Sequence, residues 1–291
     1  MKRFTGLLLG MSLLCGGISA AAQEMAGGPM PPPKVLVVMR EFLKPGKAGM
    51  VHEKSESAFV QAMTKAKWPT HYLAATSLSG RPRALFFEPF DSFEAWEKDN
   101  MAVAKNATLS AALDHATLAD GELLSEYDQS VLTYSEEYSL RPNVDIPHMR
   151  YFEVSVFRVK PGHRHDWDQI VKMVKAAYEK IPDAHWATYE EAYGGMEGTT
   201  YIVFSALKSA SEIDHSYTEE KDFLAAMGEE GMKKLSELES GAMEPGLTNL
   251  FAFSPSMSYV PEEWVKADPE FWKPRAMAPM APKKPAEKPA Q

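Results

Sequence analysis

The 291-residue chain is long enough for two domains of ordinary size. Its formal net charge is −9 at pH 7, from 31 Lys and Arg against 40 Asp and Glu. A nucleic-acid interface needs clustered Lys and Arg to contact phosphates, so this composition excludes nucleic acid as a partner.

The first 22 residues have the pattern of a secretory signal peptide. A basic start precedes an apolar stretch over residues 4–18, and small residues follow it up to Ala22. We expect cleavage near Ala22 and export to the periplasm or the extracellular side. A membrane anchor that is retained is one alternative, but the apolar stretch is shorter than the ~20 residues that span a bilayer. A lipid on Cys15 is the other alternative. Cys15 is the only cysteine, so the mature chain has none, which excludes thiol catalysis and thiolate metal sites.

The composition is also biased next to the leader and at the C-terminus. Residues 23–33 form a Pro- and Gly-rich leader, and residues 274–291 form a Pro-, Lys- and Ala-rich tail that we expect to be disordered. Residues 260–273 carry two tryptophans and a phenylalanine, which predicts a C-terminal extension packed on the folded domain. No later segment of the mature chain has the length of a transmembrane span.

Two long parts of the chain resemble each other. Lys44-Pro45-Gly46 follows the apolar run 35–39, and Lys160-Pro161-Gly162 follows a second apolar run. The matching segments lie about 116 positions apart. An internal repeat of this length predicts two units of one fold, over residues 34–140 and 148–259.

Each unit has the predicted element order β-α-β-β-α-β. In the first unit the pattern predicts strands over 34–42, 70–78, 83–90 and 129–138, and helical sequence over 48–67 and from 92 to about 125. In the second unit it predicts strands over 149–159, 184–192, 199–207 and 247–254, and helices over 164–180 and from Ser209 or Ser211 to 239. This order is typical of a ferredoxin-like antiparallel sheet with helices on one face.

The second face of such a sheet also needs a cover. Along Tyr151–Phe157 both faces are largely apolar, and the sheet of the other unit can cover the second face in a closed barrel. With its two apolar strands, its Lys-Pro-Gly triplets and its amphipathic helices, the chain resembles the dimeric α/β-barrel (ferredoxin-like) superfamily. Relatives there include antibiotic-biosynthesis monooxygenase-like and NIPSNAP-like domains. The resemblance covers about residues 34–259, and it implies a fused barrel built within one chain, as a monomer or a homodimer.

The candidate ligand-binding residues lie at the second strand of each unit. Trp, His and Tyr occur close together in both places, in the sets Trp68, His71 and Tyr72, and His185, Trp186 and Tyr189. An aromatic pocket with one imidazole suits a flat organic ligand, a haem with a histidine ligand, or a cofactor-free oxygenase that deprotonates a phenolic substrate. Core aromatics with a hydrogen-bonded histidine are the alternative interpretation.

One carboxylate stands out inside an apolar strand. Glu153 must pair with a base, titrate or reach water, and Arg40 poses the same question in the first unit. The candidate catalytic residues are therefore His71, His185 and Glu153. His163 and His165 are too close in sequence to share a helix face, and we find no other pattern typical of metal ligands, so we expect no metal site. The sequence requires no cofactor and allows haem.

These patterns support three hypotheses about function. The first is an exported α/β-barrel protein that binds a small hydrophobic or aromatic molecule. The second is a monooxygenase-like enzyme, either cofactor-independent or haem-associated. The third is a non-catalytic interaction protein of the cell envelope.

Overall fold

The computed structural model of the chain describes residues 28–194 and 199–273. The predicted signal peptide, residues 23–27 of the leader and the C-terminal tail lie outside the described residues. None of the helices in the described part combines the length and the apolar character that a membrane crossing requires.

The first half of the fold contains four strands and three helices between residues 35 and 140. They are β1 (Val35–Leu43), α1 (Met50–Ala66), β2 (Leu73–Ser77), β3 (Arg83–Phe90), α2 (Phe93–Lys105), α3 (Ala107–Gly121) and β4 (Leu124–Leu140). The helical sequence predicted from residue 92 forms two helices, because Ser92 and Asn106 each supply an N-cap. β4 also begins earlier than predicted, directly after α3.

The second half repeats this order after a short helix, η1 (Ile146–His148). It contains β5 (Tyr151–Val159), α4 (Arg164–Tyr178), β6 (Trp186–Tyr193), β7 (Thr199–Leu207), α5 (Ser211–Ala242) and β8 (Leu247–Phe253). α5 is broken at Gly228, whose φ of 67° and ψ of 169° are not helical. Two short helices, α6 (Glu262–Ala267) and α7 (Pro269–Trp272), end the described part.

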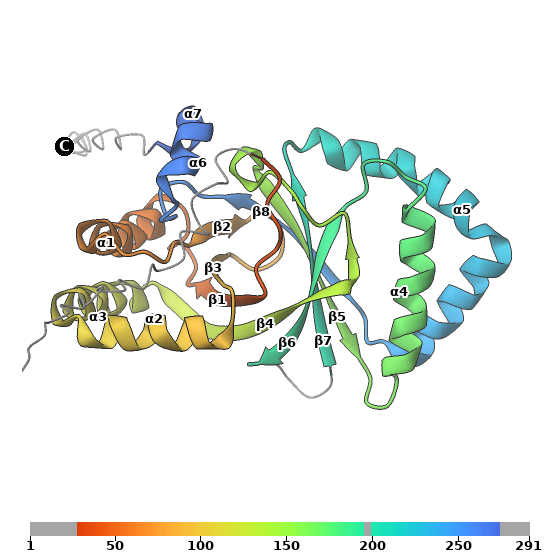
Figure 1. Cartoon of the computed structure of the whole chain (residues 1–291), viewed down its shortest axis with the longest axis horizontal. Helices are drawn as coiled ribbons and strands as arrows, with labels where there is room; N and C mark the ends of the chain where they lie inside the picture. The colour runs from red at the N-terminus through yellow and green to blue at the C-terminus, as the bar shows by residue number, and fades with distance from the viewer. Residues whose placement is uncertain (1–27, 195–198, 274–291) are drawn as a thin grey trace, which may run out of the picture.

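The strands close into one antiparallel barrel in the order β1-β3-β2-β8-β5-β7-β6-β4. Each half contributes a ferredoxin-like sheet, and the two sheets join where β2 pairs with β8 and where β4 pairs with β6. Figure 1 shows α1, α2 and α3 on one side of the barrel, and α4 and α5 on the other. The predicted fold class, an α+β fold with a closed α/β-barrel built within one chain, is confirmed.

Apolar side chains fill the interior of the barrel. The Phe87 ring lies 5.5 Å from the ring of Phe152 and 5.7 Å from that of Phe204, both in edge-on geometry. Leu132 and Phe251 are almost fully buried beside them. The interior is therefore the main hydrophobic core of the described chain, and it is packed rather than open.

Candidate functional site

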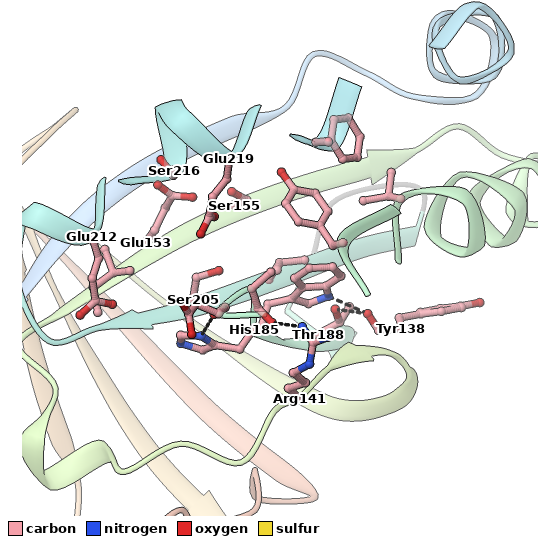
Figure 2. A pocket seen from close by; sticks show the side chains of 18 of the residues that line it. Tyr138, Arg141, Glu153, Ser155, His185, Thr188, Ser205, Glu212, Ser216 and Glu219 are labelled. Atoms are coloured by element: carbon pink, nitrogen blue, oxygen red, sulfur yellow. Dashed lines mark hydrogen bonds between the residues drawn. The ribbon is translucent and has the colours of Figure 1, made fainter. Parts of the chain in front are cut away.

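A large cleft lies outside the barrel, between the outer face of β5, β6 and β7 and the helices α4 and α5. Its volume is about 1230 Å³. Figure 2 shows part of its lining: Glu212, Ser216 and Glu219 of α5 lie across the cleft from His185 and Thr188. The volume exceeds the ~300–1,000 Å³ of typical small-molecule sites, so an aromatic ligand can be accommodated.

Three aromatic rings form one wall of the cleft. The Tyr178 ring meets the Trp186 ring edge-on at 5.5 Å and stacks on the Phe223 ring at 4.8 Å. The indole Nε1 of Trp186 donates a hydrogen bond of 2.8 Å to the carbonyl oxygen of Tyr138, which fixes the indole on β4. These rings offer flat, polarisable surface to a planar ligand.

Glu153 lies on the floor of the cleft. It stands on β5 directly opposite Ser205 of β7, and both residues line the cleft. Within residues 28–194 and 199–273, Glu153 makes no ion pair, so of the three possibilities for this carboxylate the pairing with a base is not seen. Burial raises the pKa of the Glu153 carboxyl above its usual value.

One face of α5 forms the roof. Glu212, Ser216, Glu219 and Phe223 recur at spacings of three and four, and all four line the cleft. Burial and the nearby charge of Glu219 raise the pKa of the Tyr178 hydroxyl. Because carboxylates face the aromatic wall, the cleft favours a ligand that carries a positive charge or hydrogen-bond donors.

A tight aromatic stack closes the inner end of the cleft, on the side of α4. The indole of Trp167 lies parallel to the ring of Tyr201 at 4.6 Å, and Tyr138 meets Tyr201 edge-on at 5.4 Å. Burial raises the pKa of Tyr201 to about 12. Burial and a hydrogen bond donated to Asp168 also raise the pKa of Tyr138. Both phenols are therefore protonated at neutral pH.

His185 lines the cleft, but both of its ring nitrogens are engaged. Nδ1 lies 2.8 Å from the carbonyl oxygen of Asp183, and Nε2 lies 2.8 Å from that of Ala206. A carbonyl oxygen only accepts, so each of these contacts needs a proton on the imidazole. His185 thus holds the start of β6 in place and offers no free nitrogen to a haem iron.

Arg141 fixes the loop that carries His185. Its guanidinium donates hydrogen bonds of 2.8–3.0 Å to three carbonyl oxygens of that loop, those of Glu179, Ile181 and Ala184. The positive φ of Arg141, 40°, turns the chain at the end of β4 so that the side chain can reach the loop. The edge of the cleft next to Trp186 is therefore rigidly held.

Tyr189 lies on the other side of the sheet from its predicted partners. Trp186 points to the cleft, whereas Tyr189 points into the barrel, where its ring meets that of Phe204 edge-on at 5.7 Å. Its hydroxyl donates a 3.2 Å hydrogen bond to the carbonyl oxygen of Pro33. The set His185, Trp186 and Tyr189 is thus not one site, since residues three apart on a strand face opposite ways.

The candidates of the first half do not line the cleft. Trp68 is buried and its Nε1 donates a 3.1 Å hydrogen bond to Asp99. The ring of His71 stacks on that of Tyr259 at 4.6 Å, and burial lowers its pKa. Tyr72 is buried between the sheet and the helices. This arrangement does not favour haem ligation by His71.

Arg40 and His163 have local partners. The Arg40 guanidinium donates to Asp128 and, at 2.6 Å, to the hydroxyl of Ser130. His163 contacts Asp166 three residues later through Nδ1, at 2.7 Å. The carboxylate of Asp128 neutralises the charge of Arg40. The contact between His163 and Asp166 belongs to the start of α4.

Several residues that line the cleft were not predicted from the sequence. Glu219 and Phe223 lie on a long, mostly polar helix whose period is interrupted at Gly228, so no pattern assigned them to a site. A second group, described below, includes His52 and Glu56. Their spacing of four residues on a predicted helix places both on one helix face, and it is the signal in the sequence that could have identified them.

The comparisons with known proteins show no family for the chain, and the similar solved structures are distant. No protein-family model matches the chain, and no curated protein matches it. An anthrone oxidase-like protein superposes with a TM-score of 0.48 at 15% identity, over 79% of this chain and 95% of that chain. A variant chlorite dismutase from Candidatus Nitrospira defluvii gives 0.45 at 9% identity, over 81% and 96%. A candidate monooxygenase from Fusobacterium nucleatum gives 0.47 at 12% identity, over 77% and 94%.

Similarity at this level does not carry over an activity or a ligand. The order of the strands and the placement of the helices come from the structure of this chain and do not depend on that similarity. By that topology the chain has the dimeric α/β-barrel fold, closed within a single polypeptide.

Proposed function

We propose that the chain binds a small aromatic molecule with a positive charge or hydrogen-bond donors in the cleft between β5–β7 and α4/α5. The observation that carries this proposal is the combination of an aromatic wall with a half-buried carboxylate that makes no ion pair within the described residues. Trp186 and Tyr178 supply flat surface, and Glu153 supplies an acceptor on the floor. A ligand that stacks on the wall and donates to Glu153 satisfies both.

Removing the indole should weaken this binding. Trp186→Ala should raise the dissociation constant of a cationic planar dye, acridine orange, at least tenfold, because the ligand loses the largest ring of the wall. Fluorescence titration measures the constant, and circular dichroism checks that the variant is folded. Trp186→Phe keeps an aromatic face and should stay within about threefold of wild type. Equal affinity of wild type and Trp186→Ala would place the dye elsewhere and contradict the proposal.

A second function is supported by Glu153 itself. A carboxylate whose pKa is raised by burial is a better base when ionised, and it could remove a proton from a phenolic substrate bound on the aromatic wall. In this alternative the chain is a cofactor-independent, monooxygenase-like enzyme. His185 is not its base, because both ring nitrogens face carbonyl oxygens.

The alternative predicts a defined pH dependence. Oxygen uptake with a phenolic substrate should rise as the pH passes the raised pKa of Glu153, because only the ionised carboxyl accepts a proton. Glu153→Gln should lower the rate at least a hundredfold, with a smaller change in KM. Glu237→Gln, a change on the exposed side of α5, is the matched control. An oxygen electrode gives the rates, and unchanged turnover in Glu153→Gln would exclude this residue as the base.

We further propose that the chain works outside the cytoplasm, because residues 1–22 have the composition of a cleaved signal peptide. Should the cleft bind no small molecule, a non-catalytic role in the cell envelope is the function that the packed barrel still allows.

A further inference from the structure

Four ionisable side chains meet in the first half of the fold, far from the cleft in sequence and on the opposite side of the barrel (Figure 1). Glu41 lies on β1 and points away from the barrel interior. His52 and Glu56 lie on α1, and Asp120 lies near the end of α3. Their exposed fractions are 8%, 1%, 3% and 2%. The group therefore joins three elements in a place without access to bulk water.

The geometry of the group converges on one imidazole nitrogen. His52 Nε2 lies 2.9 Å from Glu41 Oε2, 3.6 Å from Asp120 Oδ1 and 3.8 Å from Glu56 Oε1. One ligand atom from each of the four residues lies within 4.8 Å of all the others. Ligands held about 2.1 Å from a metal ion lie roughly 3.0–3.4 Å apart, so a small contraction would bring these atoms to coordinating distance.

Two of the oxygens have no hydrogen-bond partner in the described structure. Glu56 Oε1 and Asp120 Oδ1 are both fully buried and both point into the group. A buried carboxylate oxygen without a donor is rare in folded proteins, because its desolvation is not repaid. These two oxygens therefore indicate that a positively charged group belongs between them.

The charge of the group leads to the same conclusion. Three carboxylates face one histidine, and the ion pairs of Glu41, Glu56 and Asp120 in the described residues all run to His52. Three buried carboxylates beside a single imidazole carry more negative charge than that imidazole can balance, and a divalent ion would compensate the carboxylates directly.

The fold does not require this polar group. Glu41 lies three residues before Lys44-Pro45-Gly46, and Phe157 lies three residues before the second such triplet. At the position of the second half that corresponds to Glu41, Phe157 packs on Trp167 as part of an aromatic stack. A mainly aromatic packing of the corresponding place thus exists in the same chain, so the fold can be built without a buried cluster of three carboxylates and a histidine.

We propose that Glu41, His52, Glu56 and Asp120 bind one divalent transition-metal ion, of the type of Mn²⁺, Fe²⁺ or Zn²⁺. One imidazole nitrogen with carboxylate oxygens suits these ions better than Ca²⁺ or Mg²⁺, which prefer oxygen ligands alone. The ion would tie β1, α1 and α3 together. Because the site is buried, the ion should exchange slowly.

Metal analysis tests the proposal directly. Wild-type protein purified without chelators should contain about one equivalent of metal by inductively coupled plasma mass spectrometry. After treatment with a chelator, Mn²⁺, Zn²⁺ or anaerobic Fe²⁺ alone should restore one equivalent and raise Tm. The proposal is wrong if the purified protein holds no metal and none of the three ions raises its Tm.

Variants of α1 locate the ion. Glu56→Gln keeps the shape of the side chain but removes a charged ligand, and it should weaken binding at least tenfold. Glu53→Gln makes the same change on the same helix outside the group and should bind as wild type does. Equal affinity of Glu56→Gln and wild type would overturn the assignment.

A measurement on the wild-type protein covers the case in which Glu56→Gln does not fold. Bound Mn²⁺ should show magnetic coupling to a nitrogen nucleus in electron spin-echo spectra, since His52 is the one nitrogen ligand of the group. Absence of nitrogen coupling would contradict the site.

Discussion

Replacing Trp272 with alanine should lower the free energy of unfolding by about 3–5 kcal/mol. Trp272 belongs to the C-terminal extension, yet it is only 2% exposed and packs in the same cluster as the barrel interior. Its ring lies 4.8 Å from that of Phe271 and 5.5 Å from that of Trp264. The loss is large because the alanine leaves a cavity that rigid strands cannot close. Urea unfolding followed by circular dichroism gives the value.

A milder change at the same position separates packing from hydrogen bonding. Trp272 Nε1 donates a 2.8 Å hydrogen bond to the buried carbonyl oxygen of Pro147. Trp272→Phe should cost about 1–3 kcal/mol, because it removes the shorter of the two hydrogen bonds that this oxygen accepts and leaves only the 3.4 Å bond from Arg150, while much of the ring remains. A loss below about 1 kcal/mol for Trp272→Ala would mean that the extension does not belong to the core.

Trp167→Ala should also cost about 3–5 kcal/mol, since the 3%-exposed indole joins α4 to the sheet through its stack on Tyr201. At this position the change to phenylalanine should have a smaller effect than Trp272→Phe. Trp167 Nε1 is buried without a hydrogen-bond partner in the described structure, so Trp167→Phe removes an unsatisfied donor. We expect Trp167→Phe to cost about 1 kcal/mol or less, and urea unfolding again measures it.

The comparison of the two phenylalanine variants is the control for both predictions. Trp272 has a partner for its Nε1 and Trp167 has none. If Trp167→Phe lowered the free energy of unfolding as much as Trp272→Phe, the difference in hydrogen bonding would not explain the losses. The smaller size of the phenylalanine ring would then account for both. Trp167→Ala should also alter the inner end of the cleft and weaken ligand binding.

The two halves of the barrel use the space between sheet and helices in different ways. In the second half α5 stands away from the sheet and leaves the cleft, lined by Glu153 and Trp186. In the first half, α1 and α3 close over a buried group that contains His52 and Asp120. The two proposals, a ligand in the cleft and an ion in the group, concern opposite sides of the barrel and are tested independently (Figure 1).

The amino-acid sequence by itself determined the architecture. Apolar strands, amphipathic helices and two Lys-Pro-Gly triplets at a fixed separation predicted the element order, and β3 was predicted at its observed bounds, Arg83–Phe90. An apolar pattern on both faces of β5 predicted the closed barrel. Such signals are local or periodic, so they can be read without knowing which residues meet in space.

The composition of each site was decided only by the tertiary structure. The alternation of side chains along β6 separated Tyr189 from Trp186, although the two lie close in sequence. Glu41 and Asp120 reach His52 only because β1, α1 and α3 pack together. Sites of this kind depend on contacts between distant segments, whose register and crossing are fixed by the packing of the whole fold.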